Sequence, residues 1–217
     1  MGVHLIIYLA CTLFFLGNDF FFVLGAPDHA TFTLFEFTYR VLIVAVLFSL
    51  PTLQHLHDCG TSYRPNFLQA GDSIIAPTVL IIGLFLVEQS ISYQFGIERY
   101  FEFPPPDSFV LFLLDITLGL ALVSFSETLV SVVLPLRMIQ EYRLSGWWMM
   151  LVASLLFGLS HWSRGPTTMV AATLANIYFF WIAKQRRSVG AVLIVHYLVD
   201  LYFFGSQGFV LMDNRPS

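Results

Sequence analysis

The chain has 217 residues, of which 57% are hydrophobic and only 11% are charged, and its formal net charge is −4. Soluble globular domains carry about 25% charged residues. A chain with a mean hydropathy of +0.77 has too few polar side chains to cover a water-facing surface. The composition therefore excludes an ordinary soluble domain and predicts an integral membrane protein. The small net charge gives no sign of a nucleic-acid partner.

Seven apolar segments follow one another along the chain. Crossing the hydrocarbon takes about 20 residues at about 1.5 Å per residue. The first segment lacks a basic start and a small-residue cleavage site, so we interpret it as a retained helix. We expect an all-α fold, a polytopic bundle of about seven transmembrane helices forming one integral membrane domain. The predicted spans lie at about residues 3–24, 33–53, 74–93, 108–137, 147–162, 167–183 and 189–204.

The connections between these segments are unequally basic, which predicts the topology. The positive-inside rule places the more basic side in the cytoplasm, so the N-terminus is expected there and the C-terminus outside. In a bacterium the membrane would be the plasma membrane. The cytoplasmic set is Arg64, Arg137, Arg143, Lys184, Arg186 and Arg187, and the opposite set is Arg99, Arg164 and Arg215.

Ionisable groups inside hydrocarbon are costly, so each one is a candidate functional residue. In the second span, Glu36 and Arg40 are four residues apart, a spacing that favours an internal ion pair. The loop after this span contains residue types that bind zinc, but no second cluster matches it. These loop residues are His55, His57, Asp58 and Cys59.

The C-terminal half contains a second set of polar residues, distributed over three spans. Glu127 lies deep in the fourth span and His161 ends the fifth. His196 and Asp200 are four apart in the seventh span, so they share one helix face. Four such groups in a bundle that otherwise excludes charge favour a shared site.

The motifs around these residues have a recognisable order and spacing. "FGLSH" contains Phe157 and His161, "HYLVD" contains His196 and Asp200, and the basic turn "KQRRSVG" leads into the last span. Over residues 124–205 the sequence resembles the CPBP intramembrane proteases, the family of CAAX-processing endopeptidases and bacteriocin-processing relatives. The pattern of that family is EExxxR, then FxxxH, then HxxxN or HxxxD.

The first motif of the family is incomplete in this chain. In "SETLVSVVL", Ser126 and Glu127 align with the glutamate pair, and Ser131 stands where arginine is expected. A shift by one residue pairs Glu127 with Thr128 and puts Val132 at the arginine position. Either register lacks one glutamate and the arginine, so a divergent protease and an inactive relative are both open.

The resemblance implies hydrolysis of a peptide bond in a membrane-associated or lipid-anchored protein. Glu127 would act as the base, with His161 orienting the attacking water. His196 would stabilise the oxyanion, and Asp200 would accept a hydrogen bond from His196. Residues 1–107 would form about three N-terminal spans, and residues 108–217 a CPBP-like catalytic core of about four spans. The expected partners are a protein or peptide substrate and the lipid bilayer.

Other chemistries fit parts of the same set. We expect no cofactor, with zinc as the alternative, held by Glu127, His161 and His196. A catalytically inactive scaffold of the same fold would explain the incomplete first motif. A b-type haem with His161 and His196 as axial ligands would leave Glu127 and Asp200 without a role.

Overall fold

The computed structural model describes residues 2–25, 28–49, 71–97, 100 and 108–213, the last eight of these by their backbone alone. All regular elements in these ranges are helical, which confirms the predicted all-α bundle. The loop histidines at positions 55 and 57, with Asp58 and Cys59, lie outside the described residues. The same holds for three of the basic residues used for topology, Arg64, Arg99 and Arg215.

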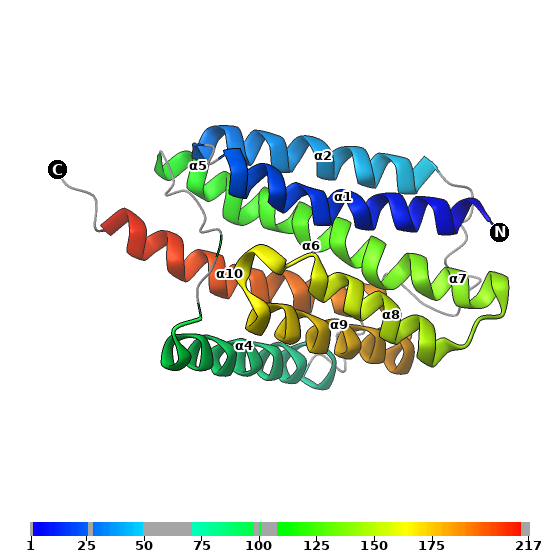
Figure 1. The fold of residues 1–217 in the computed structure, drawn as a ribbon. Helices are drawn as coiled ribbons and strands as arrows, with labels where there is room; N and C mark the ends of the chain where they lie inside the picture. The colour runs from blue at the N-terminus through cyan, green and yellow to red at the C-terminus, as the bar shows by residue number, and fades with distance from the viewer. Residues whose placement is uncertain (1, 26–27, 50–70, 98–99, 101–107, 214–217) are drawn as a thin grey trace.

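The described helices follow the seven predicted spans closely (Figure 1). One continuous helical span, Phe109–Tyr142, contains three α-helical parts joined by two π-helical turns. The elements are α1 Val3–Gly25, α2 His29–Ser49, η3 Gly71–Ile75, α4 Ala76–Phe95, α5 Phe109–Leu114, η4 Asp115–Gly119, α6 Leu120–Thr128, η5 Leu129–Val133, α7 Leu134–Tyr142, α8 Gly146–Leu159, η6 Trp162–Arg164, α9 Pro166–Arg186 and α10 Val189–Asp213.

The second helix begins about four residues earlier than the hydropathy pattern suggests. The Asp28 carboxylate accepts a hydrogen bond from the Thr31 backbone N–H at 2.7 Å. An aspartate that satisfies a free N–H of the first turn favours helix initiation at that point. Helix α2 therefore starts at His29, before the apolar segment that predicted it.

The helices are arranged in three layers (Figure 1). Helices α1 and α2 form one outer layer and α4 lies on the opposite side, with the remaining helices between them. Helix α10 packs on α4, α6 and α9, and α2 packs on α6. Two interior helices, α6 and α10, are thereby placed to contribute side chains to a common interior region.

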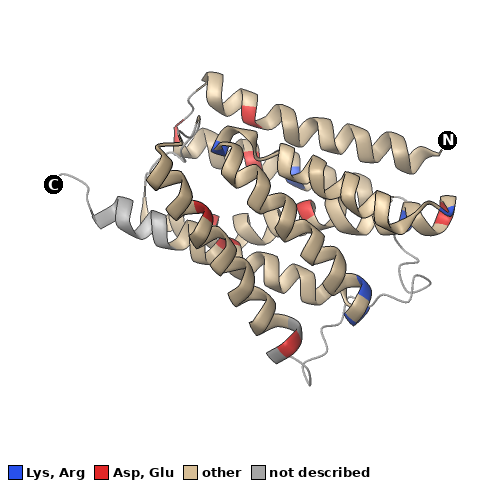
Figure 2. Cartoon of the chain, turned by 60° about the horizontal axis from the view of Figure 1, so that its bottom comes forward, with Lys and Arg blue, Asp and Glu red and all other residues tan. Residues whose placement is uncertain are grey.

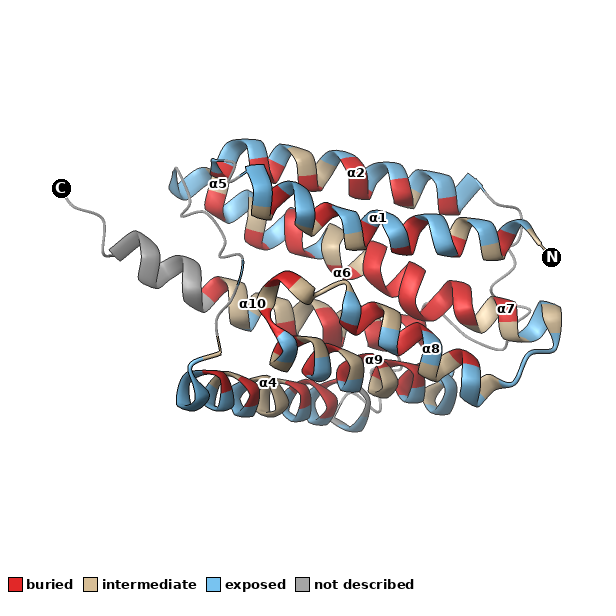
Figure 3. Ribbon diagram, in the orientation of Figure 1, coloured by how far each residue is buried: buried red, intermediate tan, exposed pale blue. Residues whose placement is uncertain are grey.

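The outward faces of the bundle are apolar, as expected for helices in lipid. Figure 3 shows exposed residues along the outer faces of α1, α2 and α4, among them Leu13, Leu34 and Val79, each more than 60% exposed. Figure 2 shows that few charged residues interrupt the length of the helices. Five helical spans are long and apolar enough to cross a membrane, and α8 and the described part of α10 are shorter apolar helices. The protein is therefore an integral membrane protein.

Helix α1 begins at one end of the bundle and α10 ends at the other (Figure 1). This arrangement agrees with seven consecutive antiparallel crossings. The end where α1 begins also holds the α7–α8 and α9–α10 connections, with Arg143 and Arg187. Which end faces the cytoplasm stays a prediction of the charge pattern.

Candidate active site

The Glu127 side chain lies in the interior of the bundle near the end of α6. It is 9% exposed, and its two carboxylate oxygens have different partners. Oε1 is 3.0 Å from Nη2 of Arg40 on α2. Oε2 is 3.6 Å from Nε2 of His196 on α10. Glu127 is thus the point at which α2, α6 and α10 meet.

His196 is buried, and its contacts indicate which ring nitrogen carries the proton. Nε2 lies 3.6 Å from Glu127 and 3.5 Å from Oδ2 of Asp200. Both distances exceed the usual hydrogen-bond range, but the negative charge of the two carboxylates favours a proton on Nε2. With the proton there, Nδ1 accepts a hydrogen bond from the hydroxyl of Thr128, whose Oγ1 lies 3.1 Å away. The neutral ring is therefore the Nε2–H tautomer.

Asp200 lies one helical turn beyond His196, as the i,i+4 spacing predicts. Its Oδ2 is 3.0 Å from the hydroxyl of Ser124 on α6. This contact holds the carboxylate between α6 and α10. Glu127, His196 and Asp200 therefore lie together in the described structure.

His161 follows the end of α8 and approaches the same region from another side. Its Nδ1 is 2.9 Å from the backbone carbonyl of Phe157. A carbonyl accepts, so Nδ1 is the donor and Nε2 of the neutral ring keeps a free lone pair. The Phe157 ring contacts both imidazoles, with centroid distances of 4.8 Å to His161 and 6.1 Å to His196. No hydrogen bond or ion pair joins His161 to Glu127 among the contacts of the described residues, so the Phe157 ring is the link between His161 and His196.

The predicted ion pair between Glu36 and Arg40 is present on α2, but it is part of a larger network. Arg40 reaches Glu127 through Nη2, and its Nη1 donates to Oγ of Ser126 at 3.0 Å. Sequence analysis found the two charges in an apolar helix but missed their contact with α6. The i,i+4 spacing of the charges contains no information on which neighbouring helix they face.

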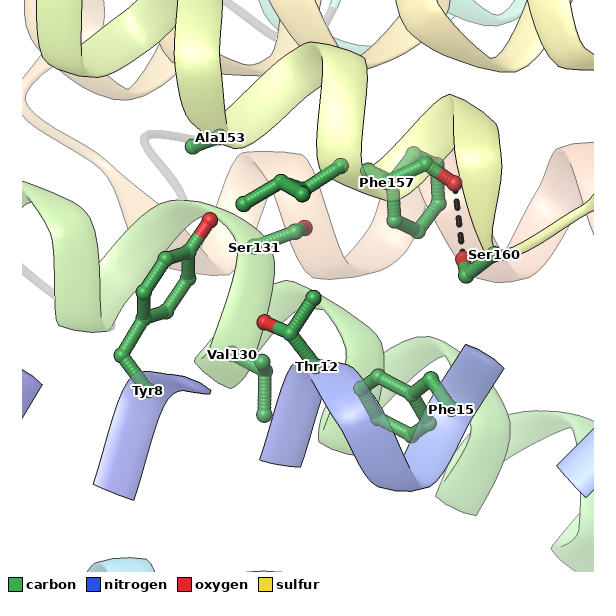
Figure 4. Close-up of a pocket in the computed structure, with 9 residues that line it drawn as sticks. Tyr8, Thr12, Phe15, Val130, Ser131, Ala153, Phe157 and Ser160 are labelled. Carbon is green, nitrogen blue, oxygen red and sulfur yellow. Dashed lines mark hydrogen bonds between the residues drawn. The ribbon is translucent and has the colours of Figure 1, made fainter. Parts of the chain in front are cut away.

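Ser131, the residue at the arginine position of the motif, has different neighbours. Its hydroxyl donates to Oδ1 of Asn176 on α9 at 2.9 Å. It also lines a small cavity between α1, η5 and α8, together with Tyr8, Thr12 and Ser160 (Figure 4). The turn that contains Ser131 is π-helical, and such turns rotate the following side chains away from α-helical register.

The residues considered as alternative zinc ligands do not form a metal-binding group in this arrangement. Within the described parts of the chain, no three His, Cys, Asp or Glu side chains are placed to hold a metal ion. Zinc binding by Glu127, His161 and His196 stays a prediction of the sequence.

Comparison with known proteins finds one similarity, which lies in the C-terminal half. A family model described as type II CAAX prenyl endopeptidase Rce1-like matches residues 109–202. The matched segment runs from α5 into α10 and contains all four predicted site residues. Over this segment the chain is similar to the CAAX-processing intramembrane proteases, the family that the motifs resemble. No curated protein and no solved structure matches the chain significantly.

Proposed function

We propose that the protein is an intramembrane endopeptidase that cleaves a membrane-associated or lipid-anchored protein with a water molecule activated by Glu127. The observation that supports this most is the cluster of Glu127, His196 and Asp200, in which Glu127 and His196 are buried, with His161 on the Phe157 ring that also contacts His196. All four residues lie within the segment that matches the protease family. The incomplete first motif still leaves one carboxylate on α6 to act as a base.

Glu127 would act first as a base and then as an acid. It accepts a proton from water as the water oxygen attacks the carbonyl carbon of the scissile bond. When the tetrahedral intermediate collapses and the C–N bond breaks, Glu127 returns that proton to the departing amine. Neighbouring Ser126 and Thr128 have hydroxyls that are not bases at neutral pH, so this role falls to Glu127.

The two histidines would have complementary roles because their tautomers differ. His161 donates from Nδ1 to Phe157, which leaves Nε2 to accept a hydrogen bond from the attacking water. His196 donates from Nε2, which suits stabilisation of the oxyanion. Its distances of 3.5 and 3.6 Å to the carboxylates exceed the usual hydrogen-bond range. The N–H is therefore held loosely enough to turn toward a substrate oxygen.

The position of His161 within the membrane supports this role. Helix α8 has 14 residues and is about 21 Å long, shorter than the roughly 30 Å hydrocarbon layer. Trp147 and Trp148 at its start are both exposed, as is common for tryptophan at a membrane interface. If α8 begins at that interface, His161 lies below the opposite one.

The first substrate class to test is a prenylated CAAX peptide, because the matching family is described as a CAAX prenyl endopeptidase. Bacteriocin-like peptides and C-terminal sorting tags are the other classes we consider. Peptides released from membranes should be compared between cells that contain the wild-type chain and cells that contain His161→Ala. Peptides that require His161 identify the substrate. If both membranes release the same peptides, the protein is a non-catalytic scaffold of this fold.

A further inference from the structure

We propose that Glu36 and Arg40 of α2 replace, from a separate helix, the carboxylate and the cation that the α6 motif lacks. In this role they position the carboxylate of Glu127. The inference rests on the proposed function, and it concerns residues outside the segment that matches the family. Both are positioning residues, because the role assigned to them acts through Glu127.

Arg40 holds three groups with three different nitrogen atoms. Nε binds Glu36, Nη1 donates to Ser126 and Nη2 contacts Glu127 at 3.0 Å. Ser126 is the residue at which one register of the motif places a glutamate. The planar guanidinium has its donors in a fixed geometry, so these contacts link α2 to α6 at Ser126 and Glu127.

Glu36 in turn fixes Arg40. Its carboxylate accepts hydrogen bonds from Nδ2 of Asn18 at 3.1 Å and from the Tyr39 hydroxyl at 3.1 Å. Asn18, Glu36 and Arg40 are each less than 10% exposed. A buried network with this many contacts restricts the rotamers of its members. Contacts from α1 and α2 therefore hold Arg40 in place through Glu36, independently of its contact with Glu127.

This arrangement makes the two oxygens of Glu127 unequal. Arg40 occupies Oε1, whereas Oε2 faces His196 at 3.6 Å. Oε2 is thus the oxygen left to accept a proton from water. Arg40 shares its charge with Glu36, so it holds the Glu127 carboxylate without serving as its exclusive counter-ion.

A role in stability alone explains the presence of Glu36 and Arg40 less well than a positioning role does. Replacing a buried ion pair with apolar residues of similar volume is often neutral or stabilising. The double variant Glu36→Gln/Arg40→Met removes both charges and keeps much of the volume. It leaves Glu127 without its cation, so its melting temperature is measured together with its activity.

The test measures kcat, KM and the melting temperature of the full-length protein in detergent, with a farnesylated CAAX peptide or a peptide identified in the membrane comparison. We expect the double variant to lose about 100-fold in kcat, the cost of misplacing a catalytic group by about 1 Å, with KM little changed. Arg40→Lys keeps the positive charge but lacks the several fixed donors of the guanidinium. Its kcat should lie between those of the double variant and the wild type. Glu88→Gln is the matched control, since Glu88 is a buried carboxylate bound by Thr167 and Thr168. It should keep the wild-type kcat.

A folded double variant with wild-type kcat would overturn this inference. The proposed function would still stand if Glu127→Gln were inactive in the same assay, and would fail if Glu127→Gln were fully active. If the double variant does not fold, Arg40→Lys decides. A lower kcat at an unchanged melting temperature supports positioning. If the activity of Arg40→Lys falls only in proportion to the loss of folded protein, the positioning role is contradicted.

Discussion

His161 and His196 differ in the nitrogen that faces the candidate site, and their backbone and hydroxyl partners determine this difference. The Phe157 carbonyl fixes one ring and Thr128 fixes the other. These partners could not be predicted from sequence, because a carbonyl is present at every residue and Thr128 lies on a different helix from His196. The spacing of His196 and Asp200 did predict their common face, since residues i and i+4 lie on the same side of an α-helix, one turn apart.

Asp200 offers a test of what its side chain must supply. Its proposed task is to orient the His196 ring by facing Nε2 at 3.5 Å, and the amide oxygen of asparagine can do the same. We expect Asp200→Asn to keep kcat within about tenfold of wild type, and Asp200→Leu to lose more, because a general acid–base site depends on orientation. Steady-state cleavage of the identified peptide measures both variants. Equal activity of Asp200→Leu and wild type would remove Asp200 from the site.

At the scale of elements, hydropathy predicted all seven spans but not their internal irregularities. Two π-helical turns, η4 and η5, flank α6. Because η5 begins directly after Thr128, the α-helical spacing assumed for EExxxR does not hold beyond Thr128. Hydropathy also cannot tell which helices pack together. The contact between α2 and α6, which brings Arg40 to Glu127, therefore could not be predicted from one sequence.

Helices α8 and α9 approach each other closely at Gly158. A Cβ atom there would lie 1.9 Å from Oγ1 of Thr173 and 2.5 Å from the carbonyl of Met169. Small residues permit such approaches between membrane helices. We expect Gly158→Ala to lower the free energy of unfolding by about 1–3 kcal/mol through overpacking. It should also reduce activity, because His161 lies three residues further on.

The matched control for this variant is Gly83→Ala on α4, where a Cβ meets nothing within 4 Å. Thermal unfolding in detergent compares the two. A melting temperature that falls equally in both, or in neither, would show that the α8–α9 contact does not depend on Gly158.

For the whole molecule, the distribution of basic residues predicts which end of the bundle faces the cytoplasm. Ser145 in the α7–α8 connection and Asp28 in the α1–α2 connection lie at opposite ends, and both are exposed. Single cysteines at these positions, with Cys11 and Cys59 replaced, can be labelled by a membrane-impermeant thiol reagent. We expect Ser145→Cys to react only from the cytoplasmic side and Asp28→Cys only from the other. The reverse pattern would invert the topology without changing the site.

The residues of the candidate site come from two separate parts of the chain. The four residues predicted from the motifs lie within the family-matched segment 109–202, whereas Glu36 and Arg40 lie on a helix outside it. Family motifs cover only the part of a chain that the family members share. A catalytic residue in that part can depend on an N-terminal helix that the motifs do not describe.

In the proposed mechanism, peptide cleavage depends most directly on the carboxylate of Glu127. The decisive measurement is kcat of purified Glu127→Gln for the identified peptide, beside wild type and Ser126→Ala, with proper folding checked by melting temperature. Glutamine keeps the shape and the contact with Arg40 but is not a base, so we predict a loss of about 10²- to 10⁴-fold. Ser126→Ala, which removes one of three acceptors of Arg40, should lose much less. A folded Glu127→Gln protein that cleaves the peptide at the wild-type rate would contradict the proposed mechanism.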